Sequence, residues 1–250
     1  MASDTDADTA NDTPTSHSIY IASAEGDTGK STVALGLLAL LTATGGRVGV
    51  FRPISRAAAG ERDYILDLLI EHDSVDIDYD DCIGVTYDQV HEDPEGAIGE
   101  IVARFHAVEA RCDRVLVLGS DYTDVGNPSE LSFNARIAAN LSAPIILALK
   151  AAGRTPQEVH GLAELLMAEI AASHATTIAL VANRCEPDQL VIIEKELEKT
   201  GMPTLCLPEE PILFAPTMAE LRDELGAQMY SGDEEPVSYT HLTLPTSDLV

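Results

Sequence analysis

Residues 18–32 read SIYIASAEGDTGKST, and this stretch decides the fold. Its first part, residues 18–23, is rich in β-branched and aromatic side chains, which predicts a β-strand. A turn with Gly26 and Gly29 follows, and the Ala- and Leu-rich stretch from Ser31 to about Thr44 predicts a helix. A strand, a glycine-rich turn and a helix in this order are the setting of a phosphate-binding loop.

The turn has the residue types that such a loop needs. Glycines let backbone N–H groups turn towards phosphate oxygens, a lysine reaches the terminal phosphates, and the next hydroxyl binds magnesium. Gly29, Lys30 and Ser31 stand in that order, although Ala24 stands where the usual pattern has glycine. We therefore expect ATP or another nucleotide with Mg²⁺; a glycine turn whose nucleotide site has decayed is the alternative. The predicted nucleotide contacts are Gly26, Asp27, Thr28, Gly29, Lys30, Ser31 and Thr32, with Ser31 also a magnesium ligand.

Two residues after later predicted strands are further candidates. Asp121 follows the strand over residues 114–118, where a carboxylate beside magnesium would lie, and a turn or helix cap is an equally good interpretation. Asn183 follows the strand over residues 176–182, where an amide could contact a nucleotide base. An asparagine in that place is more often a turn residue.

Other side chains give weaker indications. Arg52 and Arg56 follow the predicted second strand and would either meet an anionic substrate or balance nearby acids. The histidines lack metal-binding spacing, and the GxSxG motif of serine hydrolases is absent. The cysteines at 82, 112, 185 and 206 form no CxxC pair, which predicts buried, reduced thiols.

Apolar runs alternate with helical stretches along the rest of the chain. This pattern predicts an α/β fold, a doubly wound and mostly parallel sheet with helices on both faces, as in P-loop NTPases. In such a sheet, ligands bind outside the carboxyl ends of the strands. Besides the elements above, strands are predicted over residues 47–54, 144–149 and 203–207, and helices over residues 61–72, 94–110, 131–141, 155–173 and 187–200.

The chain of 250 residues has 42 acidic side chains against 15 Lys and Arg, a formal charge of −27. Such a surface repels phosphate backbones and anionic lipids, so we expect small-molecule ligands, no nucleic acid and no membrane partner. The leader lacks a signal-peptide pattern, and the apolar run over residues 33–41 is shorter than the ~20 residues that span a bilayer, which predicts a cytoplasmic protein. Most of the acidity lies in four windows, predicted to be solvated loops and tails: residues 1–17, 61–81, 88–100 and 209–235.

Several ordered motifs, from about Ser18 to Glu235, resemble the N-terminal domain of bacterial phosphate acetyltransferases. This domain is in turn similar to dethiobiotin synthetase and to the cobyrinic-acid amidating synthetases, which share the nucleotide-binding fold. The motifs are EGDTGKST (25–32), FRPISR (51–56), ELSFNARIAANLSAPIILAL (130–149), ALVANRCEPD (179–188), LPEEPILFAPTMAEL (207–221) and SGDEE (231–235).

The resemblance implies a function for the parent enzyme. Members of the family interconvert acetyl-CoA plus phosphate with acetyl phosphate plus CoA, and a C-terminal domain carries the catalysis. The N-terminal domain is regulatory or structural there, and some members have lost the loop lysine that is kept here as Lys30. The resemblance therefore implies nucleotide or phosphate binding by an inactive part of an acyltransferase, which is a homo-oligomer in its full-length form.

The same comparison of motifs predicts four regions. They are a disordered acidic leader (1–17), the nucleotide-binding domain (18–210), the start of a second domain that ends before the catalytic domain (211–235) and a non-native tail (236–250). The family pattern ends after Glu235, and residues 237–246, VSYTHLTLPT, resemble a translated sequencing adapter. We expect the gene to have been cut short by assembly, which resequencing of the locus tests.

The alternative function is that of a free-standing, ATP-dependent ligase similar to dethiobiotin synthetase. Such an enzyme phosphorylates a substrate carboxylate or carbamate and needs a second pocket, rich in cations and N–H groups, beside the loop. The acidic run over residues 73–81, in place of a helix after the second strand, argues against it.

Overall fold

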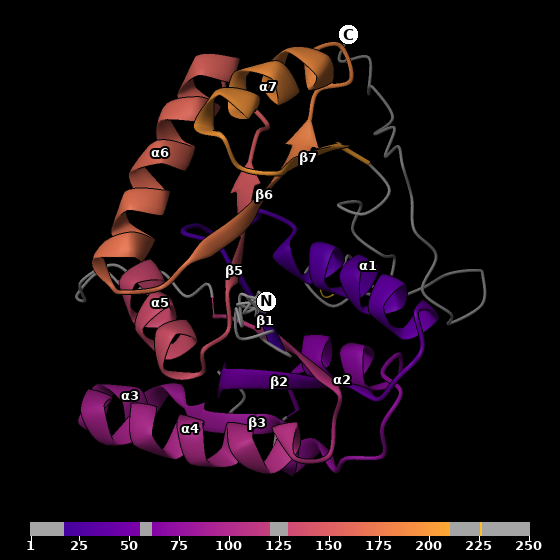
Figure 1. Cartoon of the computed structure of the whole chain (residues 1–250), viewed down its shortest axis with the longest axis vertical. Coiled ribbons are helices and arrows are strands. Elements are labelled where there is room, and N and C mark those ends of the chain that lie inside the picture. The colour runs from indigo at the N-terminus through magenta and orange to yellow at the C-terminus, as the bar shows by residue number, and fades with distance from the viewer. Residues whose placement is uncertain (1–17, 56–61, 121–129, 211–225, 227–250) are drawn as a thin grey trace, which may run out of the picture.

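The computed structural model describes residues 18–55, 62–120, 130–210 and 226. The predicted leader, Arg56, Asp121 and nearly all of residues 211–250 lie outside this part of the chain. Within it, seven strands form one sheet in the order β3-β2-β4-β1-β5-β6-β7 (Figure 1). The strands are β1 (Ser18–Ala22), β2 (Val48–Ser55), β3 (Ile83–Thr86), β4 (Arg114–Leu118), β5 (Ile145–Lys150), β6 (Thr177–Cys185) and β7 (Thr204–Pro208).

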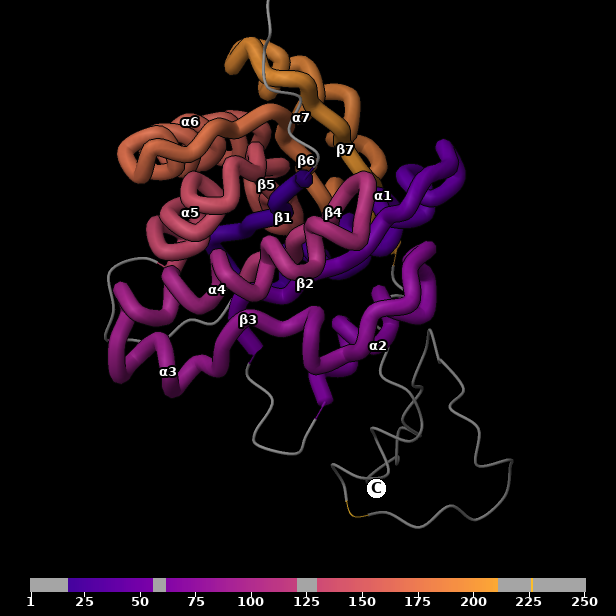
Figure 2. Tube along the Cα trace, turned by 60° about the horizontal axis from the view of Figure 1, so that its bottom comes forward, coloured from indigo at the N-terminus to yellow at the C-terminus, as the bar shows by residue number. Residues whose placement is uncertain are grey.

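All neighbouring strands run parallel, and helices cover both faces of the sheet. Helices α1 and α2 lie on one face, and α4, α5 and α6 lie on the other, with α7 against α6 (Figures 1 and 2). The predicted doubly wound α/β fold is therefore confirmed. The helices are α1 (Lys30–Ala43), α2 (Tyr64–Ile70), α3 (Tyr87–Glu92), α4 (Pro94–Glu109), α5 (Glu130–Asn140), α6 (Pro156–Ala172) and α7 (Leu190–Leu197), with 3₁₀ turns at Tyr79–Cys82 and Glu198–Thr200.

The core lies around the two central strands, β1 and β4. Tyr20 and Leu116 are fully buried there, and Ala34 and Leu38 of α1 pack on this part of the sheet. Because a parallel central strand is covered on both faces, its side chains are apolar on both sides, which explains the continuous apolar runs in the sequence. The arrangement places the carboxyl ends of β1, β4, β5 and β6 along one edge of the sheet.

Local signals in the sequence explain where two of the long helices begin. Asp93 caps α4, accepting a hydrogen bond from Gly96 N at 3.0 Å, and Pro94 takes the first helical position. Thr155 and Glu158 form a capping box at the start of α6. Asp93 and Thr155 each accept a hydrogen bond from a backbone N–H group that has no acceptor inside the helix.

Three details of the sequence interpretation are wrong. Strand β3 and helix α3 occupy residues that had no predicted element. Helix α2 follows β2 within the predicted helix over residues 61–72, so the acidic run over residues 73–81 does not take the place of a helix and is no argument against the ligase alternative. Cys112 is only half-buried, whereas the other three cysteines are buried as predicted, and none of the four forms a disulfide.

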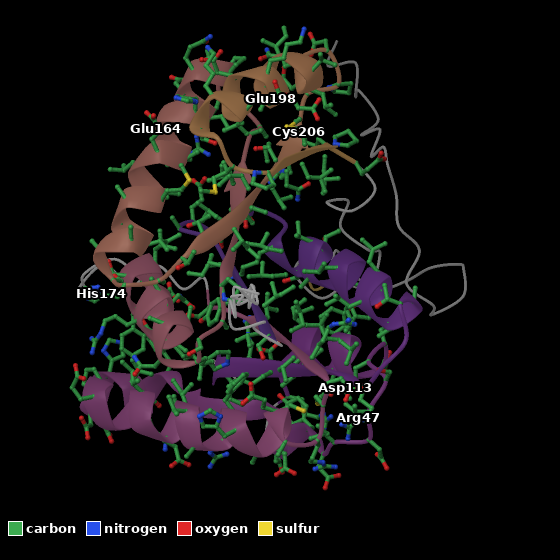
Figure 3. The ribbon with its side chains drawn as sticks, viewed as in Figure 1. Arg47, Asp113, Glu164, His174, Glu198 and Cys206 are labelled. Carbon is green, nitrogen blue, oxygen red and sulfur yellow. The ribbon has the colours of Figure 1, made fainter. Side chains whose placement is uncertain are left out.

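An exposed ion pair lies at the opposite end of the sheet, where the strands begin. Arg47 and Asp113 lie beside each other just before β2 and β4 (Figure 3), with Arg47 Nη2 at 2.8 Å from Asp113 Oδ1.

Within the described ranges, no helix has both the length and the apolar character that crossing a membrane requires. The same ranges contain no group of three or more His, Cys, Asp or Glu side chains arranged to hold a metal ion.

Candidate phosphate-binding site

The glycine-rich loop joins the carboxyl end of β1 to the start of α1. Gly29 caps the helix in the left-handed conformation, with φ at 72°, and its carbonyl accepts the first hydrogen bond from Val33 N at 3.1 Å. The first N–H groups of this 14-residue helix have no intrahelical acceptor, and the helix dipole adds partial positive charge there. No acidic residue stands in the first turn, so the helix end is available to an anion.

Lys30, the predicted phosphate ligand, lies at this helix end and is 2% exposed. Its Nζ donates a hydrogen bond to the carbonyl of Ser120, at 2.7 Å, just beyond the end of β4. Strand β4 pairs directly with β1, so the loop and Ser120 are neighbours at the same edge of the sheet. The geometry therefore keeps a buried ammonium group beside the loop.

Asn183, the predicted base contact, lies on the other side of the loop near the end of β6. Its Nδ2 donates to the Thr28 carbonyl at 2.8 Å, and the residue is 7% exposed. A Cβ atom on Gly29 would lie 2.2 Å from this Nδ2, so glycine is required here by both the positive φ and the close approach. The structure thus brings Asn183 to the loop itself, where its amide holds the backbone of Thr28.

The remaining predicted contacts differ in their burial. Thr28 is 1% exposed, Ser31 is half-buried, and Thr32 and Asp27 are exposed. Among the described residues, Thr28 Oγ1 and the Oγ of the buried Ser23 have no hydrogen-bond partner. Buried hydroxyls are normally satisfied, so these two fit a site completed by a polar ligand. Asp121, predicted near magnesium, lies outside the described residues.

Cations from β5 and the start of α6 flank the acidic part of the loop. Arg154 makes a bidentate contact with Glu25, at 2.6 and 2.8 Å, and this hydrogen bonding raises the pKa of Arg154. Lys150 Nζ lies 4.0 Å from Asp27 Oδ2. Sequence inspection missed both cations; their position after the strand of residues 144–149 was the available signal, because this strand pairs with β1.

Two arginines near the site are held by protein groups. Arg184 donates to the Asp27 carbonyl at 3.1 Å and contacts Glu209 at 2.7 Å. Arg52 is 5% exposed and contacts Asp63 at 3.1 Å and the Gly119 carbonyl at 3.0 Å. Because Asp63 also caps α2, Arg52 connects the carboxyl end of β2 to that helix and to β4.

Fold and site together define a P-loop protein, and comparison with known proteins places it in a family. The model of the AAA domain family matches residues 17–217, and the chain belongs to this family. The chain is 29% identical to a phosphate acetyltransferase of Nitratidesulfovibrio vulgaris, over 87% of this chain and 33% of that protein. It is 27% identical to a phosphate acetyltransferase of Synechocystis, over 91% of this chain and 34% of that protein.

The chain therefore spans about a third of the length of these curated relatives. The resemblance to phosphate acetyltransferases that the motifs predict is confirmed. A plasmid partition protein of Borrelia burgdorferi has a similar fold, with a TM-score of 0.50 and 20% identity, over 78% of this chain and 90% of that one. The septum site-determining protein MinD of Pyrococcus horikoshii, solved with Mg-ADP, scores 0.48 at 17% identity, over 80% and 84% of the two chains.

Proposed function

We propose that this chain is the regulatory or structural part of a phosphate acetyltransferase and binds a nucleotide or phosphate at its glycine-rich loop. The whole enzyme would interconvert acetyl-CoA plus phosphate with acetyl phosphate plus CoA. The likeness to two phosphate acetyltransferases, over a third of their length, supports the assignment to this enzyme. The observation that carries the binding role is the buried Lys30 ammonium at the start of α1.

Different groups of the loop and its neighbours have different roles in binding an anion. The N–H groups at the start of α1 donate to phosphate oxygens, and Lys30 neutralises their charge in a poorly solvated place, where the attraction is stronger than in water. We propose that Ser31 contacts a magnesium ion, which would supply further neutralisation of the phosphates. Arg154 and Lys150 offset the charge of Glu25 and Asp27, so the acidic loop does not repel the ligand.

A regulatory role requires that the ligand distinguish two states of the protein. Bound nucleotide shifts the activity of an attached catalytic domain only if its affinity differs between an active and an inactive arrangement. We propose that the loop and the strands next to it are the part that responds, because Lys30 and Asn183 connect the loop to β4 and β6.

The test is calorimetric titration of the purified chain with ATP plus Mg²⁺, ADP, NADH and inorganic phosphate. We expect binding of a phosphate-containing ligand, weakened about 10- to 100-fold by Lys30→Ala, because a charge-assisted hydrogen bond contributes about 1.5–3 kcal/mol. Lys199→Ala is the matched control, since Lys199 is exposed and contacts Glu196 far from the loop, and it should leave the affinity unchanged. Absence of binding by the wild type would contradict the proposal and leave a structural domain.

A separate assay tests the proposal that the catalytic groups lie outside this chain. We expect no acetyl phosphate from acetyl-CoA and phosphate with the purified chain, measured by release of free CoA thiol. Turnover by this chain would place the catalytic groups within it and contradict that part of the proposal.

A further inference from the structure

A buried group of polar side chains lies behind Lys30. It consists of Tyr20 on β1, Ser120 after β4, and Asn134 on α5, which are 0%, 1% and 0% exposed. Asn134 stands inside the FNARIAANL motif, to which the sequence alone gives no chemical role. Buried polar side chains such as these are costly unless they are hydrogen-bonded.

Both the oxygen and the nitrogen of the Asn134 amide are hydrogen-bonded, mostly within this group. Its Oδ1 accepts hydrogen bonds from the Tyr20 hydroxyl at 2.6 Å and from Ser120 N at 3.0 Å. Its Nδ2 donates to Ser120 Oγ at 3.1 Å and to the Glu130 carbonyl at 3.0 Å. Burial raises the pKa of Tyr20 well above its ordinary value, so the phenol keeps the proton that it donates.

The other end of the group is the ammonium of Lys30. The Ser120 carbonyl that accepts from Lys30 Nζ at 2.7 Å lies 3.4 Å from Asn134 Nδ2, so both side chains approach the same oxygen. Asn134 therefore fixes Ser120 through its N–H, its hydroxyl and its carbonyl. The position of that carbonyl in turn helps to set the position of the Lys30 ammonium.

The space around this group does not allow it to rearrange freely. A Cβ atom on Gly119 would lie 2.6 Å from both Asn134 Oδ1 and Tyr20 Cε1. Gly119 N also donates to the Ile21 carbonyl at 2.9 Å, which attaches this part of the chain to β1. The tight packing of Gly119 and the hydrogen bonds from Asn134 restrict the position of Ser120, and preorganised donors bind charge better than mobile ones.

We propose that Asn134 is a positioning residue for Lys30, which acts through Ser120 to hold the ammonium where a phosphate oxygen can share it. This inference rests on the proposed phosphate-binding role and adds to it a residue of α5, a helix on the opposite face of the sheet from α1. A phosphate that takes the ammonium weakens its hydrogen bond to Ser120, so occupancy of the loop is transmitted to α5 through Asn134.

The test compares the ATP affinity of three variants in the presence of Mg²⁺. Asn134→Ala should weaken ATP about tenfold, and Tyr20→Phe, which removes one hydrogen bond and leaves the ring in place, about two- to threefold. Asn140→Ala is the matched control, because Asn140 is on the same helix and donates to the Arg136 carbonyl at the surface. It should leave the affinity unchanged.

A role through Lys30 also predicts how the variants combine. In a Lys30→Ala background, Asn134→Ala and Tyr20→Phe should cause no further loss of ATP affinity. A folded Asn134→Ala or Tyr20→Phe variant with wild-type affinity would overturn the inference. So would the same fold-loss with and without Lys30, because that result indicates a general structural effect.

A ligand-free measurement separates this inference from the proposed function. If the wild type binds no phosphate compound, the proposed function fails, and the Lys30–Asn134 connection is tested by urea unfolding of Tyr20→Phe, Lys30→Ala and the double variant. A combined change in the unfolding equilibrium constant smaller than the product of the single changes supports the connection. Multiplicative changes overturn it.

Discussion

Two kinds of interaction hold the phosphate loop: buried hydrogen bonds to carbonyl groups, which we call its neutral side, and a partly exposed ion pair, which we call its ionic side. On the neutral side, the buried side chains of Lys30 and Asn183 donate hydrogen bonds to the carbonyl groups of Ser120 and Thr28. On the other side, Glu25 pairs with Arg154, whose side chains are 33% and 29% exposed. Hydrogen bonds in a poorly solvated place are directional and insensitive to salt, whereas partly exposed ion pairs are screened.

This difference indicates that the neutral side determines how tightly a phosphate binds. The ionic side reduces the repulsion between the acidic loop and the phosphate. The neutral side places one cation accurately, which is what binding a phosphate requires. The ionic side cancels charge on a loop that carries two acids, Glu25 and Asp27, in a protein with a formal charge of −27. A variant that disturbs the neutral side should therefore cost more than one that disturbs the ionic side.

The largest loss of stability is expected for a substitution at Gly29, where the loop contacts Asn183. Gly29→Ala adds a Cβ atom at a φ of +72° and 2.2 Å from Asn183 Nδ2, so it strains the backbone and removes the bond to Thr28. We expect a loss of about 2–5 kcal/mol in the free energy of unfolding, the sum of backbone strain and an unsatisfied buried group. Urea unfolding measures it, and phosphate binding should be lost as well.

Gly153→Ala is the matched control for this prediction. Gly153 has the same φ of +72°, but no atom lies within 4 Å of its would-be Cβ. Gly153→Ala should lower the free energy of unfolding only by the cost of backbone strain, about 1–2 kcal/mol. Equal losses for both variants would contradict the claim that the contact with Asn183 constrains the loop.

Much of the fold could be predicted from the sequence because its signals are local. The strand over residues 18–23, the loop and the helix after it were recognisable from residue types alone, and Asp93 and Thr155 are residue types that favour a helix start. Strand β3 was missed because IGVT is short, contains a glycine and follows an acidic stretch. Strand β6 continues to Cys185, beyond the predicted end at residue 182, because Cys185 still pairs with Pro208.

The site was less predictable because its partners come from distant parts of the chain. Lys30 and Gly29 were found from the loop itself, whereas Arg154 and Asn134 are related to it only by the pairing of β1 with β5 and β4. Asn134 is 114 residues from Tyr20, the residue from whose hydroxyl it accepts a hydrogen bond. No spacing rule links such residues, and their relation emerges only from the strand order.

A smaller effect is expected at Asp73, a carboxylate away from both sides of the loop. Burial, opposed by a hydrogen bond from Val75 N and supported by the charge of Asp76, raises the pKa of Asp73 from 3.8 to about 6. Because the folded protein binds the proton more tightly, the carboxylate costs stability that grows between about pH 4 and pH 6 and is complete above it. Asp73→Asn should therefore raise the free energy of unfolding at pH 7.5 by about 1 kcal/mol, after allowance for solvent screening, and leave it unchanged near pH 3.5.

In the same measurement, Asp113→Asn should change the free energy of unfolding in the opposite direction. The hydrogen bonds from Arg47 lower the pKa of Asp113, so its contribution to stability is present at neutral pH and is lost as the pH falls below its ordinary range. Asp113→Asn should lower the stability at pH 7.5. If Asp73→Asn is also destabilising at that pH, the assignment of a burial cost to Asp73 is wrong.

The smallest effect is expected on the ionic side, for the pair of Glu25 and Arg154. A double-mutant cycle with Glu25→Gln and Arg154→Ala should give a coupling of about 0.5–1 kcal/mol in low salt, falling below about 0.3 kcal/mol in 1 M NaCl because exposed charges are screened. The pair of Glu100 and Arg104 on α4, which is 2.7 Å apart and more exposed, is the reference and should give a smaller coupling. A coupling for Glu25 and Arg154 that survives 1 M NaCl would mean that this side, too, acts through buried hydrogen bonds, and the contrast between the two sides would be lost.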